Sequence, residues 1–294
     1  MTLIIAGHNR SMFNDMVFFV GDSLLSAYNG KTHRRDRLIE IYKKIRSIPV
    51  VVWTPTFDRN DSFDGYSPAF KSNCVIAFAG SALTFGHMLN GIQEHLGQLR
   101  YTFFQQNYKI VKHCSHEAIR YSDTELWDED IHFSQSHMPN LTADFQMEVI
   151  SHVIRRALQD VSARVFDQAS FEALRCELAI ALYCWEKNAS ELFHVEIMLT
   201  DEVPKTPTFR VKKLAYTEIL VLGKPIKEQA QTIFDEARHK GGEGVQAAIQ
   251  RLVREHISAD IECDENYIGG KLDCWTFQRA RPKQWYMSVE ADEM

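Results

Sequence analysis

The second residue of the chain combines two groups that could do chemistry together. Thr2 directly follows Met1, and its side chain is small enough for methionine aminopeptidase to remove that methionine. A chain that begins with threonine carries a hydroxyl that can attack a carbonyl and an α-amine, with a pKa of about 7.7 to 8.0, that can take the proton. Many proteins begin Met-Thr by chance, so these two letters alone do not assign an activity.

A second group of candidates is a set of histidines in a polar, irregular region: His113, His116, His132 and His137. The region has neither a supporting cysteine nor the HExxH spacing of a helical zinc site. We interpret them as surface histidines and expect no metal ion and no cofactor. The glycine-rich "HKGGEG" at 239–244 joins two predicted helices instead of a strand and a helix, so it indicates a turn and not a phosphate-binding loop.

The six cysteines show no CxxC pair, and most of them stand in apolar, strand-like runs. Both features are typical of reduced core residues and not of disulfides or metal ligands. The residues are Cys74, Cys114, Cys176, Cys184, Cys263 and Cys274.

Composition indicates a globular protein with a sizeable core. Of the 294 residues, 45% are apolar and 24% are charged, and the net charge of -6 comes without a basic block. These values argue against binding to nucleic acid or to an anionic membrane surface. The chain also has no apolar run long enough to cross a bilayer and no secretory signal at its N-terminus, so we expect a cytoplasmic protein.

Apolar runs in the first third of the chain predict strands. Residues 2–23 read as a hairpin with a polar turn at 8–15, and further strands are expected over 39–53 and 74–80. The segment 54–72 is rich in Pro, Ser, Asp and Gly, which predicts an exposed insertion loop.

Helical spacing follows directly, over residues 81–99, where Ser81 is a candidate N-cap. The rest of the chain alternates between pairs of helices and groups of strands. Further helices are predicted over 143–166, 225–239 and 244–257, and further strands over 176–185, 191–199, 216–223, 271–277 and 285–291.

The order of elements favours an α+β fold, because strands come in runs and helices in pairs. Two antiparallel sheets stacked face to face, with a helix pair outside each, would bury the continuous apolar strands on both faces. We therefore expect a four-layer αββα sandwich. It forms one domain over residues 1–294, with surface insertions near 54–72 and 113–143.

Several short motifs in this order resemble one known family. They are the N-terminal threonine before a strand, "GDS" at 21–23, "KKI" at 43–45 and "FAGSA" at 78–82. The chain resembles the β-type subunits of the proteasome and their bacterial relatives HslV and Anbu, within the N-terminal-nucleophile (Ntn) hydrolases. The similarity is clearest over residues 2–100, and the order of elements extends it through "NYIGGKLDCW" at the C-terminal end.

The resemblance implies roles for individual residues. Thr2 takes the position of the nucleophile, Asp22 that of the orienting carboxylate, and Lys44 that of the lysine it holds. A cation near the threonine amine and hydroxyl would keep the amine neutral and favour the transition state. Lys43 is the rival of Lys44, but adjacent strand residues point to opposite faces. The backbone N–H of Gly80 takes the position of the oxyanion donor.

The chain departs from the family pattern in two places. Lys224, in "GKP", stands where the family has a supporting serine, and Ile268, in "ENYIGG", replaces another. Glu265 can supply the carboxylate of the second motif, or Asp264 with a shift of register. Phe78 falls where the family lines the pocket for the residue before the scissile bond.

The resemblance implies an N-terminal threonine hydrolase that cleaves peptide bonds without a cofactor. It also implies a homo-oligomeric ring or spiral that acts on peptides or unfolded proteins, with an unfoldase or cap as a further partner. Two alternatives stay open: an inactive assembly protein that keeps the fold, which the two lost hydroxyls favour, and an Ntn amidohydrolase of a small amide.

Overall fold

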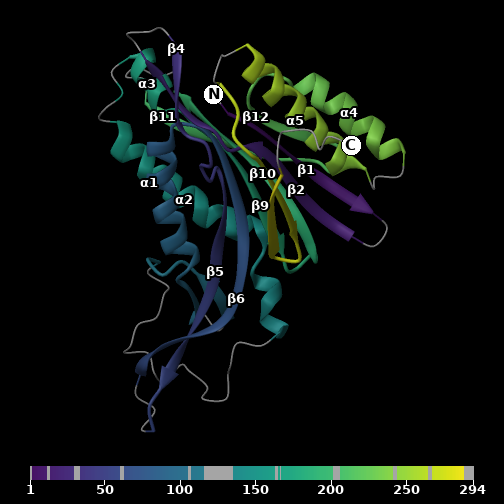
Figure 1. Ribbon diagram of the computed structural model, residues 1–294. Helices are drawn as coiled ribbons and strands as arrows, with labels where there is room; N and C mark the ends of the chain where they lie inside the picture. The colour runs from purple at the N-terminus through teal and green to yellow at the C-terminus, as the bar shows by residue number, and fades with distance from the viewer. Residues whose placement is uncertain are drawn as a thin grey trace.

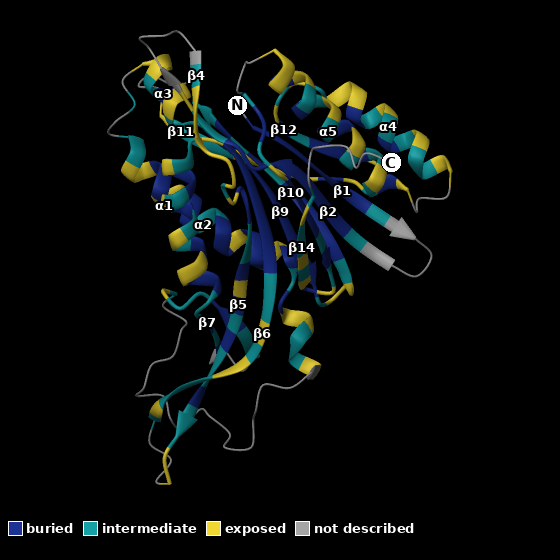
Figure 2. Cartoon of the chain, in the orientation of Figure 1, coloured by how far each residue is buried: buried dark blue, intermediate teal, exposed yellow. Residues whose placement is uncertain are grey.

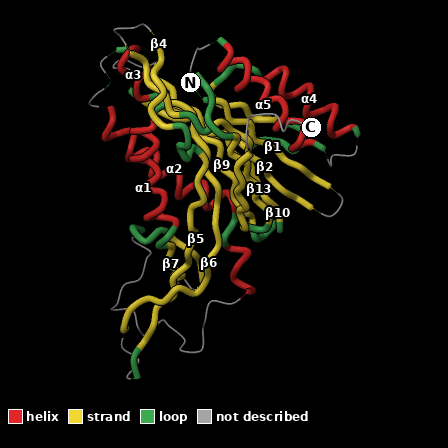
Figure 3. Tube along the Cα trace, viewed as in Figure 1, coloured by secondary structure: helices red, strands yellow, loops and turns green. Residues whose placement is uncertain are grey.

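The computed structural model describes residues 2–11, 14–29, 34–59, 63–104, 107–115, 135–162, 165, 167–200, 206–240, 244–263 and 267–287. It shows a mixed α/β protein, whose strands and helices are distinguished in Figure 3. The described helices are α1 (Ala82–Leu96), the 3-10 helix η2 (Gln135–Asn140), α2 (Ala143–Ser162), α3 (Gln168–Leu174), α4 (Lys227–His239) and α5 (Val245–Glu262).

One sheet has five strands, each paired antiparallel with its neighbours. The predicted hairpin of residues 2–23 is there, but its expected eight-residue turn is wrong: the ladder continues as far as the pair Ser11 and Asn14. Backbone pairing needs no apolar side chains, so polar residues can extend an existing ladder. The strand order is β12 (Ile219–Gly223), β1 (Leu3–Ser11), β2 (Asn14–Asp22), β13 (Leu272–Gln278) and β14 (Arg281–Met287).

The other large sheet has seven strands and is mixed, which corrects the expectation of two purely antiparallel sheets. The exception is the parallel pairing of β5 with β7, which joins Val52 to Leu99. Because α1 lies between these strands in the chain, it can act as the crossover that a parallel pair needs. The order is β11 (Pro207–Lys213), β10 (Ala189–Leu199), β9 (Cys176–Cys184), β6 (Phe63–Gly80), β5 (Ile45–Phe57), β7 (Leu99–Phe104) and β8 (Asn107–Val111).

The expected loop over 54–72 is also wrong, because its described residues continue β5 and β6 as a paired ribbon. In Figure 1 this ribbon extends well beyond the rest of the molecule. Edge-on packing of Phe63 against Phe57 and Tyr66 supplies apolar contact along it. A second, smaller ribbon pairs β3 (Leu25–Asn29) with β4 (Arg34–Ile39).

Three clusters of buried side chains explain how the elements stack. One cluster joins α1 and α2 to the seven-stranded sheet, the second joins the two large sheets, and the third joins the five-stranded sheet to α4 and α5. Ile4 and Ala6 face the cluster between the sheets, whereas Leu3 and Ile5 face α4 and α5. Burial on both faces accounts for the continuous apolar runs of these strands (Figure 2).

Helix starts follow from the sequence where a cap is present. The Ser81 side chain accepts a hydrogen bond from the Thr84 N–H, which confirms the predicted N-cap of α1. None of the helices in the described parts of the chain combines the length and the apolar character needed to cross a bilayer. Four cysteines are buried, as expected, but Cys114 and Cys263 are exposed and so are not core residues.

Candidate active site

Thr2 lies immediately before β1, next to the end of β12, where Leu3 pairs with Gly223. Although it is a polar residue close to the start of the chain, it is only 7% exposed. Its backbone is fixed from one side, because the N–H of Lys224 donates to the Thr2 carbonyl oxygen at 3.0 Å.

Asp22, the last residue of β2, joins the beginning of β1 to a lysine. One carboxylate oxygen, Oδ1, accepts a hydrogen bond from the Leu3 N–H at 2.8 Å. The other, Oδ2, accepts from Lys44 Nζ at 2.8 Å and from the Gly269 N–H at 3.3 Å. A single buried carboxylate therefore holds the ammonium of Lys44 next to the peptide bond that links Thr2 to Leu3.

Lys44 is a buried cation, with a side chain that is 3% exposed. Burial lowers the pKa of Lys44, and the nearby charge and hydrogen bond of Asp22 act in the opposite direction. Lys43, the alternative in the sequence, is exposed. The expected strand over 39–53 begins only at Ile45, since residues 40–44 form an irregular crossing between β4 and β5.

Gly80 ends β6 where α1 begins, and its conformation requires glycine. Its φ is +105°, and a Cβ at this position would lie 2.4 Å from the carbonyl oxygen of Arg175. The same carbonyl accepts the Ser81 N–H at 2.9 Å. Two residues earlier, the Phe78 N–H donates to the Lys44 carbonyl oxygen at 3.2 Å, so the end of β6 runs beside Lys44.

Phe78, which the resemblance assigns to the lining of the substrate pocket, packs in the core between the seven-stranded sheet and α1. It is 2% exposed and stacks on Phe85 of α1 with the ring centroids 3.8 Å apart. Packing between the sheet and α1 therefore determines the position of this ring.

Of the C-terminal motif "ENYIGG", Asp264 and Glu265 lie outside the described residues. Ile268 is fully buried in the cluster under α5, and its N–H donates to Asp260 Oδ2 at 3.1 Å. The Tyr267 N–H donates to the same oxygen at 2.8 Å. Asp260 thus holds this turn in place, a role that the sequence did not reveal because the residue lies beyond the helix predicted over 244–257, whereas α5 extends to Glu262.

Ser23 is a second residue that the sequence reading missed. Its Oγ donates to the Glu40 carbonyl oxygen at 2.7 Å and accepts the Lys271 N–H at 2.8 Å, while the Ser23 N–H donates to the Gly269 carbonyl oxygen at 3.1 Å. Ser23 therefore connects residues 40–44, which include Lys44, to the turn at Gly269, whose N–H donates to Asp22. Its place in "GDS" was the available signal.

Asp273 of β13 pairs with Gly21, one residue before Asp22, and is buried. Its Oδ1 accepts hydrogen bonds from Trp275 Nε1 and Gln284 Nε2, both at 2.9 Å. Burial raises the pKa of Asp273 to about 6, and these hydrogen bonds act in the opposite direction.

We expect this carboxyl to make the stability of the protein pH-dependent. Its pKa is about 6 in the folded chain, against a usual value of 3.8, so between these values the folded state binds more protons than the unfolded state. The free energy of unfolding then falls as the pH rises. Relative to wild type, Asp273→Asn should gain about 1 to 3 kcal/mol between pH 3.5 and pH 7. Urea unfolding of both proteins across this range measures the gain, and the exposed Asp58→Asn should show none.

The structure brings Thr2, Asp22 and Lys44 together and sets the end of β6 beside them. His113 and His137 are half-buried, whereas His116 and His132 lie outside the described residues.

Comparison with known proteins adds one similarity. No protein-family model and no curated protein matches the chain. Among solved structures, the chain is similar to "Anbu (Gly-1) mutant from Hyphomicrobium sp. strain MC1", with a TM-score of 0.47 and 11% sequence identity, over 99% of this chain and 88% of that chain.

Proposed function

We propose that the protein is an N-terminal threonine hydrolase that cleaves peptide bonds, with Thr2 as the nucleophile once Met1 has been removed. The observation that carries the proposal is the Asp22 carboxylate, which binds both the Leu3 N–H and Lys44 Nζ at 2.8 Å. Burying a lysine is costly unless it is paired, and this pair is buried beside a threonine that directly precedes β1.

The proposed reaction uses both groups of Thr2. The α-amine takes the hydroxyl proton as Oγ attacks the peptide carbonyl, and it then gives that proton to the departing amine. An ester bond between Oγ and the acyl carbon forms while the peptide C–N bond breaks. A water molecule, deprotonated by the same amine, then hydrolyses the ester and regenerates the threonine.

The surrounding residues supply electrostatics in this proposal. Lys44 stabilises the negative charge that develops near Thr2, and Asp22 holds Lys44 in position. The Gly80 N–H donates to the oxyanion, and Glu265, or Asp264 with a shift of register, supplies the further carboxylate that the resemblance implies. Ile268 supplies no hydroxyl, and we expect each lost hydrogen bond to lower the rate by about tenfold to a hundredfold.

We further propose that the stacked layers form a four-layer αββα sandwich of the Ntn-hydrolase type, as a single domain with an insertion near 113–143. The three buried clusters support this layering. Peptides or unfolded proteins in the cytoplasm are the proposed substrates, and a homo-oligomeric ring or spiral the proposed assembly, with an unfoldase or cap as partner.

A second candidate is an assembly protein without catalytic activity. Ile268 favours it, because this side chain is fully buried among apolar residues where a hydroxyl would support the amine. In that case the buried ion pair of Asp22 and Lys44 contributes only to the conformation of the chain.

Turnover of a fluorogenic peptide library separates the two candidates. Wild type should hydrolyse some of the peptides, Thr2→Ser should retain part of this activity because it keeps a hydroxyl, and Thr2→Ala should have none. The exposed Thr217→Ala serves as the matched control and should behave as wild type. Equal turnover by wild type and Thr2→Ala would exclude Thr2 as the nucleophile, and no turnover by a chain that begins with Thr2 would favour the assembly protein.

A further inference from the structure

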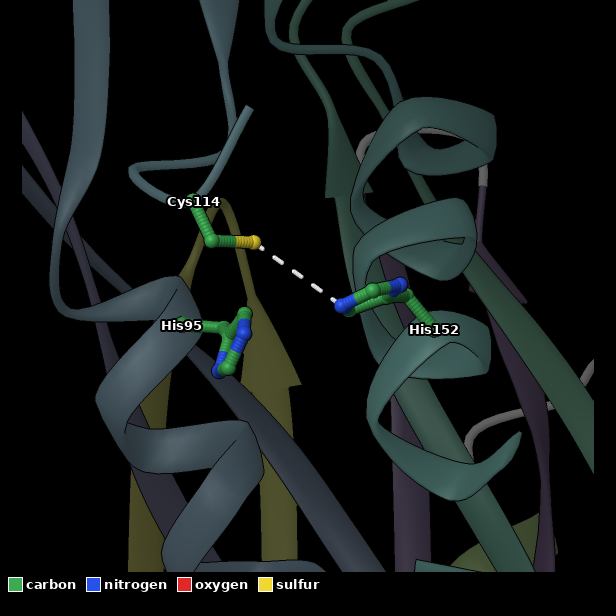
Figure 4. Close-up of side chains that lie close together, drawn as sticks. All are labelled: His95, Cys114 and His152. Carbon is green, nitrogen blue, oxygen red and sulfur yellow. Dashed lines mark hydrogen bonds between the residues drawn. The ribbon is translucent and has the colours of Figure 1, made fainter. Parts of the chain in front are cut away.

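Three metal-binding side chains from separate elements meet at the far end of α1. His95 comes from the last turn of α1, Cys114 from the turn after β8, and His152 from the middle of α2. Figure 4 shows the three side chains directed toward a common point. One donor atom of each lies within 4.8 Å of the other two, and Cys114 Sγ is 3.8 Å from His152 Nε2.

The orientation of His95 points to a ligand. Its Nδ1 lies 3.0 Å from the Gly91 carbonyl oxygen, and a carbonyl can only accept, so Nδ1 carries the proton. Nε2 is then left with a free electron pair. This atom is buried and has no hydrogen-bond partner among the described residues, in a side chain that is only 6% exposed. In metal-binding histidines one ring nitrogen usually donates its proton to a carbonyl or carboxylate, and the other keeps a free electron pair for the metal.

We propose that His95 Nε2, Cys114 Sγ and His152 Nε2 bind a zinc ion. Zn–N distances of about 2.0 to 2.1 Å and a Zn–S distance of about 2.3 Å place tetrahedral ligands about 3.4 to 3.6 Å apart. The 3.8 Å between Cys114 and His152 is close to this value, and the other two pairs of donor atoms, which lie within 4.8 Å, have to close by at most about 1 Å on binding. One thiolate with two imidazoles is a donor set that suits zinc.

A groove of about 670 Å³ gives the ion a route to the site, since Cys114 and His152 lie on its wall. It also supplies space for water as the fourth ligand. Lys112, on the same wall, is paired with Glu148 at 3.1 Å, which reduces its repulsion of a cation. Zinc has to displace the proton that Cys114 Sγ and His152 Nε2 share and release it to solvent, so zinc binding should weaken as the pH falls.

The bound ion would join α1, α2 and the turn after β8. Cys114 is exposed and contributes little to the core, so the chain can fold without the ion. The ion would therefore hold these three elements together. The site is separate from Thr2 and does not depend on the proposed hydrolase activity.

Metal titration of the full chain tests the site. After removal of metals by a chelator, wild type should bind one Zn²⁺ per chain, and its melting temperature should rise by about 5 °C at a hundredfold excess over Kd. Cobalt as a probe should give the charge-transfer absorption of a thiolate ligand. Cys114→Ser should lose this absorption, and both Cys114→Ser and His152→Ala should bind zinc at least tenfold more weakly.

Matched controls keep the result specific. Cys263→Ser removes the other exposed cysteine, at the end of α5, and His87→Ala removes an exposed histidine of α1. Both should bind zinc as wild type does. Undiminished zinc binding by Cys114→Ser, or a cobalt spectrum without thiolate absorption in wild type, would overturn the proposal.

Discussion

Lys44→Met should lower the free energy of unfolding by about 3 to 5 kcal/mol, because it leaves the buried carboxylate of Asp22 without its counter-ion. Asp22 would keep only its hydrogen bonds from the Leu3 and Gly269 N–H groups. If the proposed mechanism holds, peptide turnover should also fall by about 10² to 10³-fold, since the cation near Thr2 is gone. Urea unfolding and initial rates measure the two effects on one preparation.

The double variant Asp22→Asn/Lys44→Met separates the two effects. An asparagine can still accept the Leu3 N–H, and no buried charge is left unpaired, so stability should return to within about 1 kcal/mol of wild type. Turnover should stay low, because the cation is still missing. A double variant with wild-type turnover would show that Lys44 acts only on folding, and a fully stable Lys44→Met would show that the ion pair contributes little.

Gly223→Ala should have the second large effect. The φ of Gly223 is +84°, and a Cβ there would lie 1.9 Å from the carbonyl oxygen of Thr2. Relief of that clash has to move either β12 or Thr2 itself, and a non-glycine residue at this φ adds roughly 1 to 2 kcal/mol of strain. We expect a loss of at least about 3 kcal/mol in unfolding free energy, in line with other changes that disturb special backbone positions and packing. Reaction of Thr2 with covalent inhibitors should slow at the same time.

Gly86→Ala provides the comparison for this variant. Gly86 lies inside α1, and an added Cβ there meets no atom within 4 Å. Alanine should therefore stabilise the helix by about 0.5 to 1 kcal/mol. Thermal unfolding of both variants checks the opposite signs, and a Gly223→Ala protein as stable as Gly86→Ala would contradict the tight contact with Thr2.

Much of the fold was predictable, because apolar runs indicate where the strands lie and the residues that flank them indicate where strands and helices begin. The run from Leu3 to Ala6 is apolar at every position, and the structure buries it on both faces. Ser81 marked the start of α1 correctly. The ribbon over 54–72 was missed since its strands are rich in residues that favour turns, and its pairing depends on contacts between β5 and β6 that no local pattern encodes.

The sequence distinguished Lys44 from Lys43 but did not predict the path of the chain around Lys44. Alternation along a strand separated Lys44 from Lys43, but residues 40–44 are not a strand at all. They are held in an irregular path by Ser23, which accepts the Tyr42 N–H through its carbonyl oxygen, and by the pairing of Lys44 with Asp22. Such a path is set by tertiary contacts, so the sequence alone could not predict it.

The cluster of His95, Cys114 and His152 was missed for a similar reason. The sequence reading grouped histidines that were close along the chain, whereas these three residues come from two helices and a turn. Only the packing of α1 against α2 brings them together. Cys114 was read as a core residue together with the other cysteines, most of which stand in apolar runs, but the structure leaves it exposed.

Intact mass of the purified protein, before and after incubation with a β-lactone or a peptide epoxyketone, tests most directly whether Thr2 is the nucleophile, because both probes react with N-terminal threonine. Wild type should lack Met1 and carry a single adduct that maps to Thr2, and Thr2→Ala should carry none. A retained Met1, or a chain that begins with Thr2 and stays unmodified by both probes, would contradict this role of Thr2.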